Sequence, residues 1–531
     1  MNCTAINLSY QQTGYFSKLI TDYLNGEESL TPFYKHPVSI EGIKSAIHDR
    51  EQFKPNRTVL VDELNKQYGS VTISDPVEKN IKKLSAEKTF TITTAHQPAI
   101  FTGTLFFIYK ILHTIKLANH LSEKLPQYNF VPVYYMGNED ADLDELNHIY
   151  LDNEKIVWDT KQKGAVGRMN TKGLEKIIDR IEGEFSVRPF GKELVELLKD
   201  CYLKSENVQS ATFFLINKLF GEYGLVVLIP DTANLKKLMQ TVFEDDLLKQ
   251  TASSIVEKTI AAFPEKYKVQ ANPREINLFY LKDDTRELIE LKNQKYEVRN
   301  TNIQFSKEEI LAELKTNPER FSPNVILRGL YQSTILPDIV FIGGGGETAY
   351  WLELKNLFEN YSVPYPMLVI RNSFLIIEKK WKEKINKTGL TVAEIFKPEN
   401  ELLSELVKKE STNKLSLVKE IDDAENYYLN LKLIGADVDP TLVQHVEALR
   451  TKALKEIKEF EKKLLRNEKR KFDDVHRQLH DIKSALFPLN NLQERIENFI
   501  PYYAKWGAAF IDLLYKSSLA LDQEFVVLEE K

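Results

Sequence analysis

The chain has 531 residues, of which 43% are hydrophobic and 28% charged, and these values predict a folded protein of about three domain-sized units rather than a disordered one. A net charge of −6 argues against a general nucleic-acid binder, which needs a basic face. Cys3 and Cys201 are too few for a disulfide framework or a zinc site. Without a basic leader or about 18 continuous apolar residues, we expect a cytoplasmic protein that has no membrane span.

The first strongly patterned elements follow a polar, mostly helical region of about 85 residues. Residues 89–94 form a β-branched run typical of a strand, the apolar spacing over 103–121 predicts a helix, and 129–136 predict a second strand. A strand, helix and strand of these lengths indicate parallel pairing, and therefore an α/β fold with a parallel sheet. Three further apolar runs are typical of buried parallel strands: 224–231, 338–346 and 366–372.

Two segments depart from this pattern. Residues 151–222 are more polar and helical, and we expect them to form an insertion in the sheet domain. Residues 267–300 predict short antiparallel strands around a turn at Asp283 and Asp284.

The C-terminal part is charged and helix-forming after about residue 377. From Val446 to Leu486, apolar residues recur every three or four positions, which predicts a long helix with the narrow apolar seam of a coiled coil. Pro488 ends that helix. The seam pairs either within one chain or between two. We therefore predict three parts: a core at 1–377, a helical coiled-coil domain at 378–500, and a tail at 501–531 that packs back on the core.

The turn after the first strand carries polar side chains. His96 and Gln97 end the strand, Thr102 lies near the start of the helix, and Gly103 lets a ligand approach the backbone closely. The first N–H groups of a helix and the positive end of its dipole attract anions, so we expect this turn to bind phosphate. The alternative is a polar turn in which Thr102 only caps the helix.

Five carboxylates follow the second strand within seven residues, among them Glu139, Asp140 and Asp142. They lie at the carboxyl end of a strand, where open α/β sheets bind ligands, and they suit an ammonium group, sugar hydroxyls or Mg²⁺. The alternative is an acidic, solvated helix start. An EF-hand loop is excluded because Glu145 stands where that loop needs glycine, and we predict no dedicated metal site.

A glycine-rich turn follows the run that begins at residue 338. It is no P-loop, because no Gly-Lys-Ser/Thr follows, and no dinucleotide fingerprint, because Thr348 stands where the last glycine should be. Gly344 and Gly345 still allow a nucleotide or substrate to contact the backbone, and we expect Glu347 and Tyr350 at the same mouth. A tight structural turn is the alternative.

Arg328 is a candidate clamp for phosphate or carboxylate, unless it forms an ordinary salt bridge. Arg371 is a weaker candidate of the same kind. Because the ends of parallel strands share one edge of a sheet, we expect Thr102, Asp140 and Glu347 to surround a common cavity.

Five motifs occur in order along nearly the whole chain: HQPAIFTG, EDADLDELNH, SPNVILRGLYQSTILP, GGGGETAYW and LFPLNNLQERIENFIPYYAKWG. With them the chain resembles the cysteine-adding enzymes of bacillithiol biosynthesis, the cysteine ligase family of that pathway. Where that family usually has Glu-Asp-His-Asp, this chain has Ala141 in place of the histidine. The resemblance implies a Rossmann-like core of the class I aminoacyl-tRNA-synthetase type with insertions, and a long coiled coil that joins two subunits into a homodimer.

The resemblance also implies that cysteine is attached to the amino group of glucosaminyl-malate. We expect ATP, with or without Mg²⁺, to activate the cysteine carboxylate. The residues expected to bind ATP are His96, Gln97, Thr102, Gly103 and Arg328. Those expected to bind substrate are Glu139, Asp140, Asp142, Gly344, Gly345 and Tyr350, and those expected in catalysis are His96 and Glu347, the latter as base. The alternatives are a transferase that uses a preactivated cysteine donor, and a non-catalytic nucleotide-binding coiled-coil scaffold.

Overall fold

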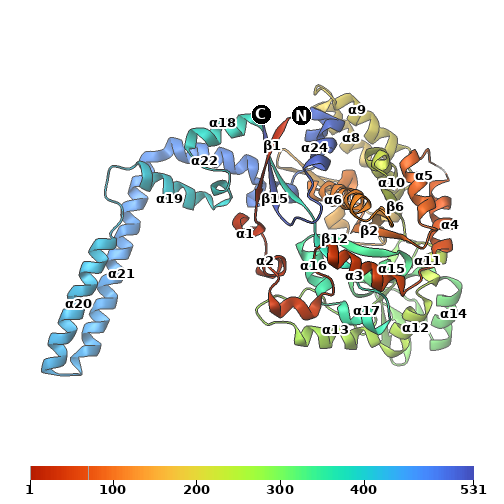
Figure 1. The fold of residues 1–531 in the computed structure, drawn as a ribbon, viewed down its shortest axis with the longest axis horizontal. Coiled ribbons are helices and arrows are strands. Elements are labelled where there is room, and N and C mark those ends of the chain that lie inside the picture. The colour runs from red at the N-terminus through yellow and green to blue at the C-terminus, as the bar shows by residue number, and fades with distance from the viewer. Residues whose placement is uncertain (1, 70) are drawn as a thin grey trace. The chain divides into compact units, whose positions relative to one another are not determined.

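A computed structural model describes residues 2–69 and 71–531 (Figure 1). The chain divides into two compact units. The first holds the chain up to Gln11, residues 15–376 and residues 491–531, and the second holds residues 12–14 and 377–490. Among the described residues, no helix is long and apolar enough to cross a membrane.

The centre of the first unit is a five-stranded sheet in which every pair of neighbours is parallel. Its order is β13-β12-β2-β3-β6, and the strands are β2 (Thr89–His96), β3 (Asn129–Met136), β6 (Val226–Leu228), β12 (Asp338–Gly343) and β13 (Met367–Ile370). Each lies within or overlaps a predicted apolar run, so the predicted α/β fold with a parallel sheet is confirmed.

Helix α6 (Leu105–Lys124) connects β2 to β3, as predicted, and packs on both strands. Together with α3 (Ile40–Glu51) it contributes to a buried cluster that includes Phe90, Ile92 and Ile342 from the sheet. The register places His96 beside Met136 and Thr94 beside Ile342. The carboxyl ends of β2, β3 and β12 therefore lie next to one another at one edge.

The N-terminal region is mostly helical, as predicted, but it begins with a strand. Strand β1 (Cys3–Leu8) pairs antiparallel with β15 (Phe525–Glu530), and β14 (Ser373–Ile377) completes this three-stranded sheet. Because the partner of β1 lies at the other end of the chain, no local pattern indicates this strand. The helices that follow β1 are α1 (Tyr10–Thr13), α2 (Lys18–Leu24), α3, α4 (Arg57–Tyr68) and α5 (Asp75–Lys83).

Between β3 and β6 the chain forms a hairpin and several helices, in the region of the predicted insertion. These elements are α7 (Leu143–Leu146), β4 (His148–Leu151), β5 (Glu154–Val157), α8 (Leu174–Phe185), α9 (Gly191–Leu198) and α10 (Val208–Phe220).

A second five-stranded sheet lies between β6 and β12 in the sequence. Its order is β10-β9-β8-β7-β11, and the turn at Asp283 and Asp284 separates β7 from β8, as predicted. The strands are β7 (Leu278–Lys282), β8 (Thr285–Lys292), β9 (Lys295–Val298), β10 (Gln304–Phe305) and β11 (Phe321–Pro323). The other helices of the first unit are α11 (Ala233–Lys237), α12 (Gln240–Lys249), α13 (Thr251–Ala262), α14 (Lys307–Thr316), α15 (Val325–Ile335), α16 (Gly345–Leu352), α17 (Lys355–Asn360), α23 (Ile500–Trp506) and α24 (Ala508–Ser517).

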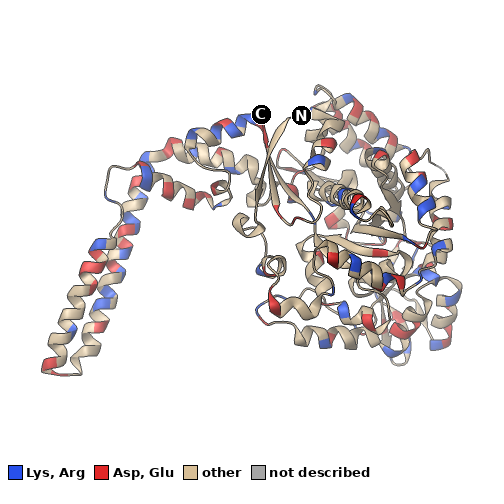
Figure 2. Cartoon of the chain, viewed as in Figure 1, with Lys and Arg blue, Asp and Glu red and all other residues tan. Residues whose placement is uncertain are grey.

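The second unit is helical and contains an antiparallel pair, α20 (Val418–Val438) and α21 (Leu442–Lys469) (Figure 1). Arg450 pairs with Glu425, and the Leu417 N–H donates to Glu461 at 2.8 Å, which sets the antiparallel register. Figure 2 shows acidic and basic residues interspersed along both helices. The seam helix α21 therefore packs against a helix of its own chain.

The predicted single long helix from Val446 to Leu486 is wrong in one respect. A 3-10 turn at Arg470–Phe472 separates α21 from α22 (Asp473–Leu486), where a run of polar residues at 466–471 interrupts the apolar seam. The remaining helices of this unit are α18 (Lys379–Thr388) and α19 (Glu399–Glu410).

Candidate active site at the carboxyl edge of the parallel sheet

A cavity of about 420 Å³ opens where β2, β3 and β12 end. Its walls come from these strand ends, from α15 and α16, and from β8 of the second five-stranded sheet. Seven of the predicted site residues line it: His96, Gln97, Glu139, Asp140, Arg328, Glu347 and Tyr350. Segments that are about 250 residues apart in the sequence thus contribute to one site.

The end of β2 contributes His96 and Gln97. The His96 ring lies against the rings of Phe106 and Phe107, with centroid separations of 5.3 and 5.0 Å. Burial, together with the nearby charges of Lys110 and Arg371, holds the pKa of His96 well below its ordinary value. The imidazole is therefore uncharged at neutral pH.

Gln97 connects the first turn to the acidic stretch. Its Nε2 donates a hydrogen bond to Oδ2 of Asp140 at 3.0 Å. This contact fixes the orientation of the Asp140 carboxylate at the cavity wall.

Thr102 and Gly103 do not line the cavity. The turn that contains them has positive φ angles at Phe101 (49°), Thr102 (69°) and Gly103 (62°). The Thr102 side chain is buried. The structure therefore does not bring Thr102 together with Asp140 and Glu347.

Protein groups already occupy the backbone of this turn. Asn498 Nδ2 donates to the carbonyl oxygens of Phe101 and Gly103 at 2.8 and 2.5 Å. The Leu105 N–H, at the start of α6, donates to the Glu497 carbonyl at 2.8 Å. The C-terminal segment around Asn498 thus contacts this turn, and its Glu497 carbonyl accepts the first N–H of α6, which we expected to bind phosphate.

The acidic stretch is divided between the cavity and solvent. Glu139 is buried and forms an ion pair with Lys236, whose Nζ lies 2.6 Å from Oε1. Asp142 lies outside the cavity and caps α7 by accepting the Glu145 N–H at 3.4 Å, as the helix-start alternative describes. Glu145 does line the cavity, and partial burial with the charges of Asp142 and Asp140 raises its pKa.

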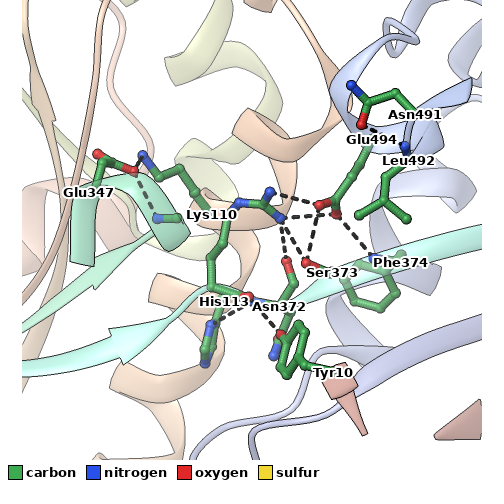
Figure 3. A network of polar contacts seen from close by, with 12 residues as sticks. Tyr10, Lys110, His113, Glu347, Asn372, Ser373, Phe374, Asn491, Leu492 and Glu494 are labelled. Atoms are coloured by element: carbon green, nitrogen blue, oxygen red, sulfur yellow. Dashed lines mark hydrogen bonds and ion pairs between the residues drawn. The ribbon is translucent and has the colours of Figure 1, made fainter. Parts of the chain in front are cut away.

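The glycine turn holds Glu347 in a fixed position. Oε2 of Glu347 accepts the Gly344 N–H at 2.8 Å and lies 2.5 Å from Nζ of Lys110, a buried lysine of α6 (Figure 3). Lys110 also donates to the Ala95 carbonyl at 2.7 Å, and burial lowers its pKa. Gly344 and Gly345 do not line this cavity, and Gly345 instead lines a separate pocket.

Arg328 extends from α15 into the cavity. Its Nη2 donates to the Tyr350 hydroxyl at 2.8 Å and its Nη1 to Oε1 of Gln332 at 3.2 Å. No carboxylate of the described chain forms an ion pair with it, so the salt-bridge alternative finds no support there. Arg328 is partly buried and has no ion-pair partner among the described residues, so its guanidinium can attract an anionic ligand.

Arg371 lies in a different environment. Its guanidinium is bound by the buried carboxylate of Glu494, with nitrogen–oxygen distances of 2.7 and 3.0 Å. Figure 3 shows Glu494 also accepting hydrogen bonds from Ser373 and Phe374. Arg371 therefore has an internal partner, and it does not line the cavity.

Two family models match the chain over nearly its full length. One, described as "Bacillithiol biosynthesis BshC, N-terminal Rossmann-like domain", matches residues 1–372. The other, "Bacillithiol biosynthesis BshC, C-terminal coiled-coil domain", matches residues 374–530. The chain belongs to the BshC family.

Several BshC-family relatives carry the name "Putative cysteine ligase BshC". The one from Flavobacterium johnsoniae is 40% identical over 98% of this chain and 99% of its own length. The relative from Flavobacterium psychrophilum is 41% identical over 98% of this chain and 99% of its own length. The relative from Cytophaga hutchinsonii is 39% identical over 96% of each chain.

Sequence reasoning missed three residues that lie at or beside this cavity. Lys110 has a detectable signal, because a lysine interrupts the apolar face predicted for α6. Glu145 belongs to the acidic stretch but was not among the residues expected to bind substrate. Arg286 of β8 has no local signal, since only the tertiary placement of the second sheet brings it to the cavity.

Proposed function

We propose that this BshC-family chain is a ligase that joins the carboxyl group of cysteine to the amino group of glucosaminyl-malate. The observation that supports it is the distribution of charge in the cavity. Arg328, without a carboxylate partner among the described residues, lines the same space as Asp140 and Glu145. Such a space attracts carboxylate or phosphate to one group and an ammonium or hydroxyl-bearing ligand to the others.

ATP is the proposed activating co-substrate. Amide formation removes one oxygen from the cysteine carboxylate, so that oxygen must first become part of a leaving group. A phosphoryl or nucleotidyl group from ATP provides this, and phosphate or AMP then leaves as the amine nitrogen bonds to the carbonyl carbon. Arg328, with the neutral imidazole of His96 and the amide of Gln97, can bind the anionic oxygens.

Mg²⁺ would accompany ATP rather than occupy a protein cage. Within residues 2–69 and 71–531, no group of three or more His, Cys, Asp or Glu side chains is arranged to hold a metal ion. Mg²⁺ usually takes most of its ligands from phosphates and water, with only one or two carboxylates. Asp140 and Glu145 can supply that small protein share.

The attacking amine must lose a proton, and Glu347 is the proposed acceptor. One oxygen of its carboxylate is held by Lys110 and the Gly344 N–H, while the other has no contact drawn in Figure 3. Fixing one oxygen orients the other toward a reacting group. Glu145, whose pKa is raised, is the second candidate at this cavity.

We also propose that the protein is a cytoplasmic homodimer joined through the second unit. Helices α20 and α21 expose large apolar side chains, among them Leu433 (66% exposed), Ile434 (61%) and Phe460 (55%). Light scattering should give the mass of two chains. A single-chain mass at micromolar concentration would contradict this proposal.

Mass spectrometry tests the ligase directly. The purified protein is incubated with cysteine and glucosaminyl-malate, with and without ATP, and the amide is detected at the summed mass of the substrates less one water. We expect product only with ATP. Product formed without ATP from an activated cysteine donor would indicate the transferase, and no product under either condition would contradict catalysis.

A further inference from the structure

Arg286 is held rigidly at the cavity wall by the second sheet. Its Nε donates to the Ser322 hydroxyl of β11 at 3.1 Å, and its guanidinium lies 4.1 Å from the ring centroid of Phe279 on β7. The side chain is only 12% exposed. The guanidinium is therefore already oriented in the absence of a ligand.

The outer two nitrogens of this guanidinium are unused. In the described chain, Nη1 and Nη2 of Arg286 donate no hydrogen bond, and the nearest carboxylate oxygen, Oδ1 of Asp140, is 4.0 Å from Nη1. Two other buried arginines differ, because Arg50 is bonded to Asp338 at 3.0 Å and Arg371 to Glu494 at 2.7 Å. A buried guanidinium with open donors costs free energy unless a ligand completes it.

The shape of the open donors specifies the ligand. Nη1 and Nη2 form a planar fork that matches the two oxygens of a carboxylate. Asp140 and Glu145 line the same cavity and favour amine and hydroxyl groups nearby. A molecule that carries hydroxyls, an amine and a carboxylate fits this combination of groups.

We propose that Arg286 binds a malyl carboxylate of glucosaminyl-malate and is the residue that makes the site specific for an acidic acceptor. The inference rests on the proposed function, because that function supplies the acceptor. Arg328, beside Glu347 and Tyr350, then remains available for the cysteine carboxylate or for phosphate.

Calorimetry on the full-length protein, without ATP or cysteine, tests the assignment. Two ligands are compared: glucosaminyl-malate and its malyl diamide, which lacks both negative charges. We expect the wild-type protein to bind the acid roughly 10- to 100-fold more tightly, as for a lost charged hydrogen bond. Arg286→Gln should abolish most of this preference, because it should weaken the binding of glucosaminyl-malate but not that of the diamide.

Two further variants sharpen the result. Arg299→Gln removes an exposed arginine in the turn after β9 that does not line the cavity, so the preference of this variant should equal that of the wild type. Arg286→Lys keeps the charge but not the fork, and should retain only part of the preference. Thermal unfolding shows whether Arg286→Gln folds. If it does not, Arg286→Lys tests the role of Arg286 in its place.

An unchanged preference for the acid in folded Arg286→Gln or Arg286→Lys would overturn the inference, as would a wild-type protein that does not distinguish acid from diamide. The ligation assay separates this failure from that of the proposed function. Product formation with an unchanged preference in the variants refutes only the role of Arg286. An Arg286-dependent preference without product supports that role and refutes the ligase.

Discussion

Nζ of Lys110 lies 2.5 Å from Oε2 of Glu347, so a lysine from the first crossover helix fixes the carboxylate at the glycine turn (Figure 3). The lysine side chain is 1% exposed and that of the glutamate 26%. The pair thus joins two of the three strand-end turns that build the cavity.

Separate removal of the two partners should have unequal effects. Glu347→Gln leaves a buried charge without its partner and should lower the free energy of unfolding by roughly 3–5 kcal/mol. Lys110→Met should cost less, because Glu347 is nearer to solvent. The double variant should recover part of the loss, with a coupling of about 1–3 kcal/mol.

Urea denaturation measures this cycle. Glu123→Gln, an exposed change on the same helix, is the control and should stay within about 0.5 kcal/mol of the wild type. Additive effects of the Lys110 and Glu347 variants would show that the two residues do not interact.

Glu494 provides a second prediction, on how the C-terminal segment is attached. It is fully buried and accepts hydrogen bonds from Arg371, Ser373 and the Phe374 N–H. Glu494→Ala should destabilise the first unit by about 3–5 kcal/mol, because it leaves Arg371 buried without a counter-charge. Denaturant unfolding checks this against Glu78→Ala, which removes an exposed ion pair with Lys82 and should cost less than about 1 kcal/mol. Equal costs would contradict the structural role of Glu494.

Asp246 predicts a pH dependence of stability. Burial raises its pKa to about 7, although Asn277 donates hydrogen bonds to both of its oxygens. A carboxyl group whose pKa is higher in the folded than in the unfolded state contributes stability that is complete below about pH 4 and is lost as pH rises through about 7. The wild type should therefore lose more stability than Asp246→Asn between pH 4 and 7.5, by an amount on the order of a few kcal/mol. Equal losses of unfolding free energy in the two proteins across this pH range would contradict the raised pKa of Asp246.

Four strands of the parallel sheet were predictable because each is a continuous, buried apolar run, and β2 was predictable from its β-branched residues. Strand β1 was not, since Cys3–Leu8 becomes a strand only by pairing with residues more than 500 positions away. Residue type and position near a strand end were enough to place Asp140 and Glu347 at one cavity.

The same reasoning did not place Thr102 and Gly103 correctly. They lie outside the cavity, and the carbonyl of Glu497, from the far end of the chain, accepts the Leu105 N–H that was expected to bind phosphate. Arg286 shows the converse. Its local sequence predicts only a hairpin, and its role at the cavity arises from how the second sheet meets the first.

The central claim is that the cavity between the strand ends is where cysteine is joined to its acceptor. Asp140 and Asp144 belong to the same acidic stretch, but only Asp140 lines the cavity. Comparing the kcat/KM of Asp140→Asn and Asp144→Asn for ATP-dependent ligation, measured by mass spectrometry, tests the claim most directly. We expect Asp140→Asn to lose roughly 100-fold or more and Asp144→Asn to lose less than about 2-fold. Equal losses, or full activity in Asp140→Asn, would contradict the claim.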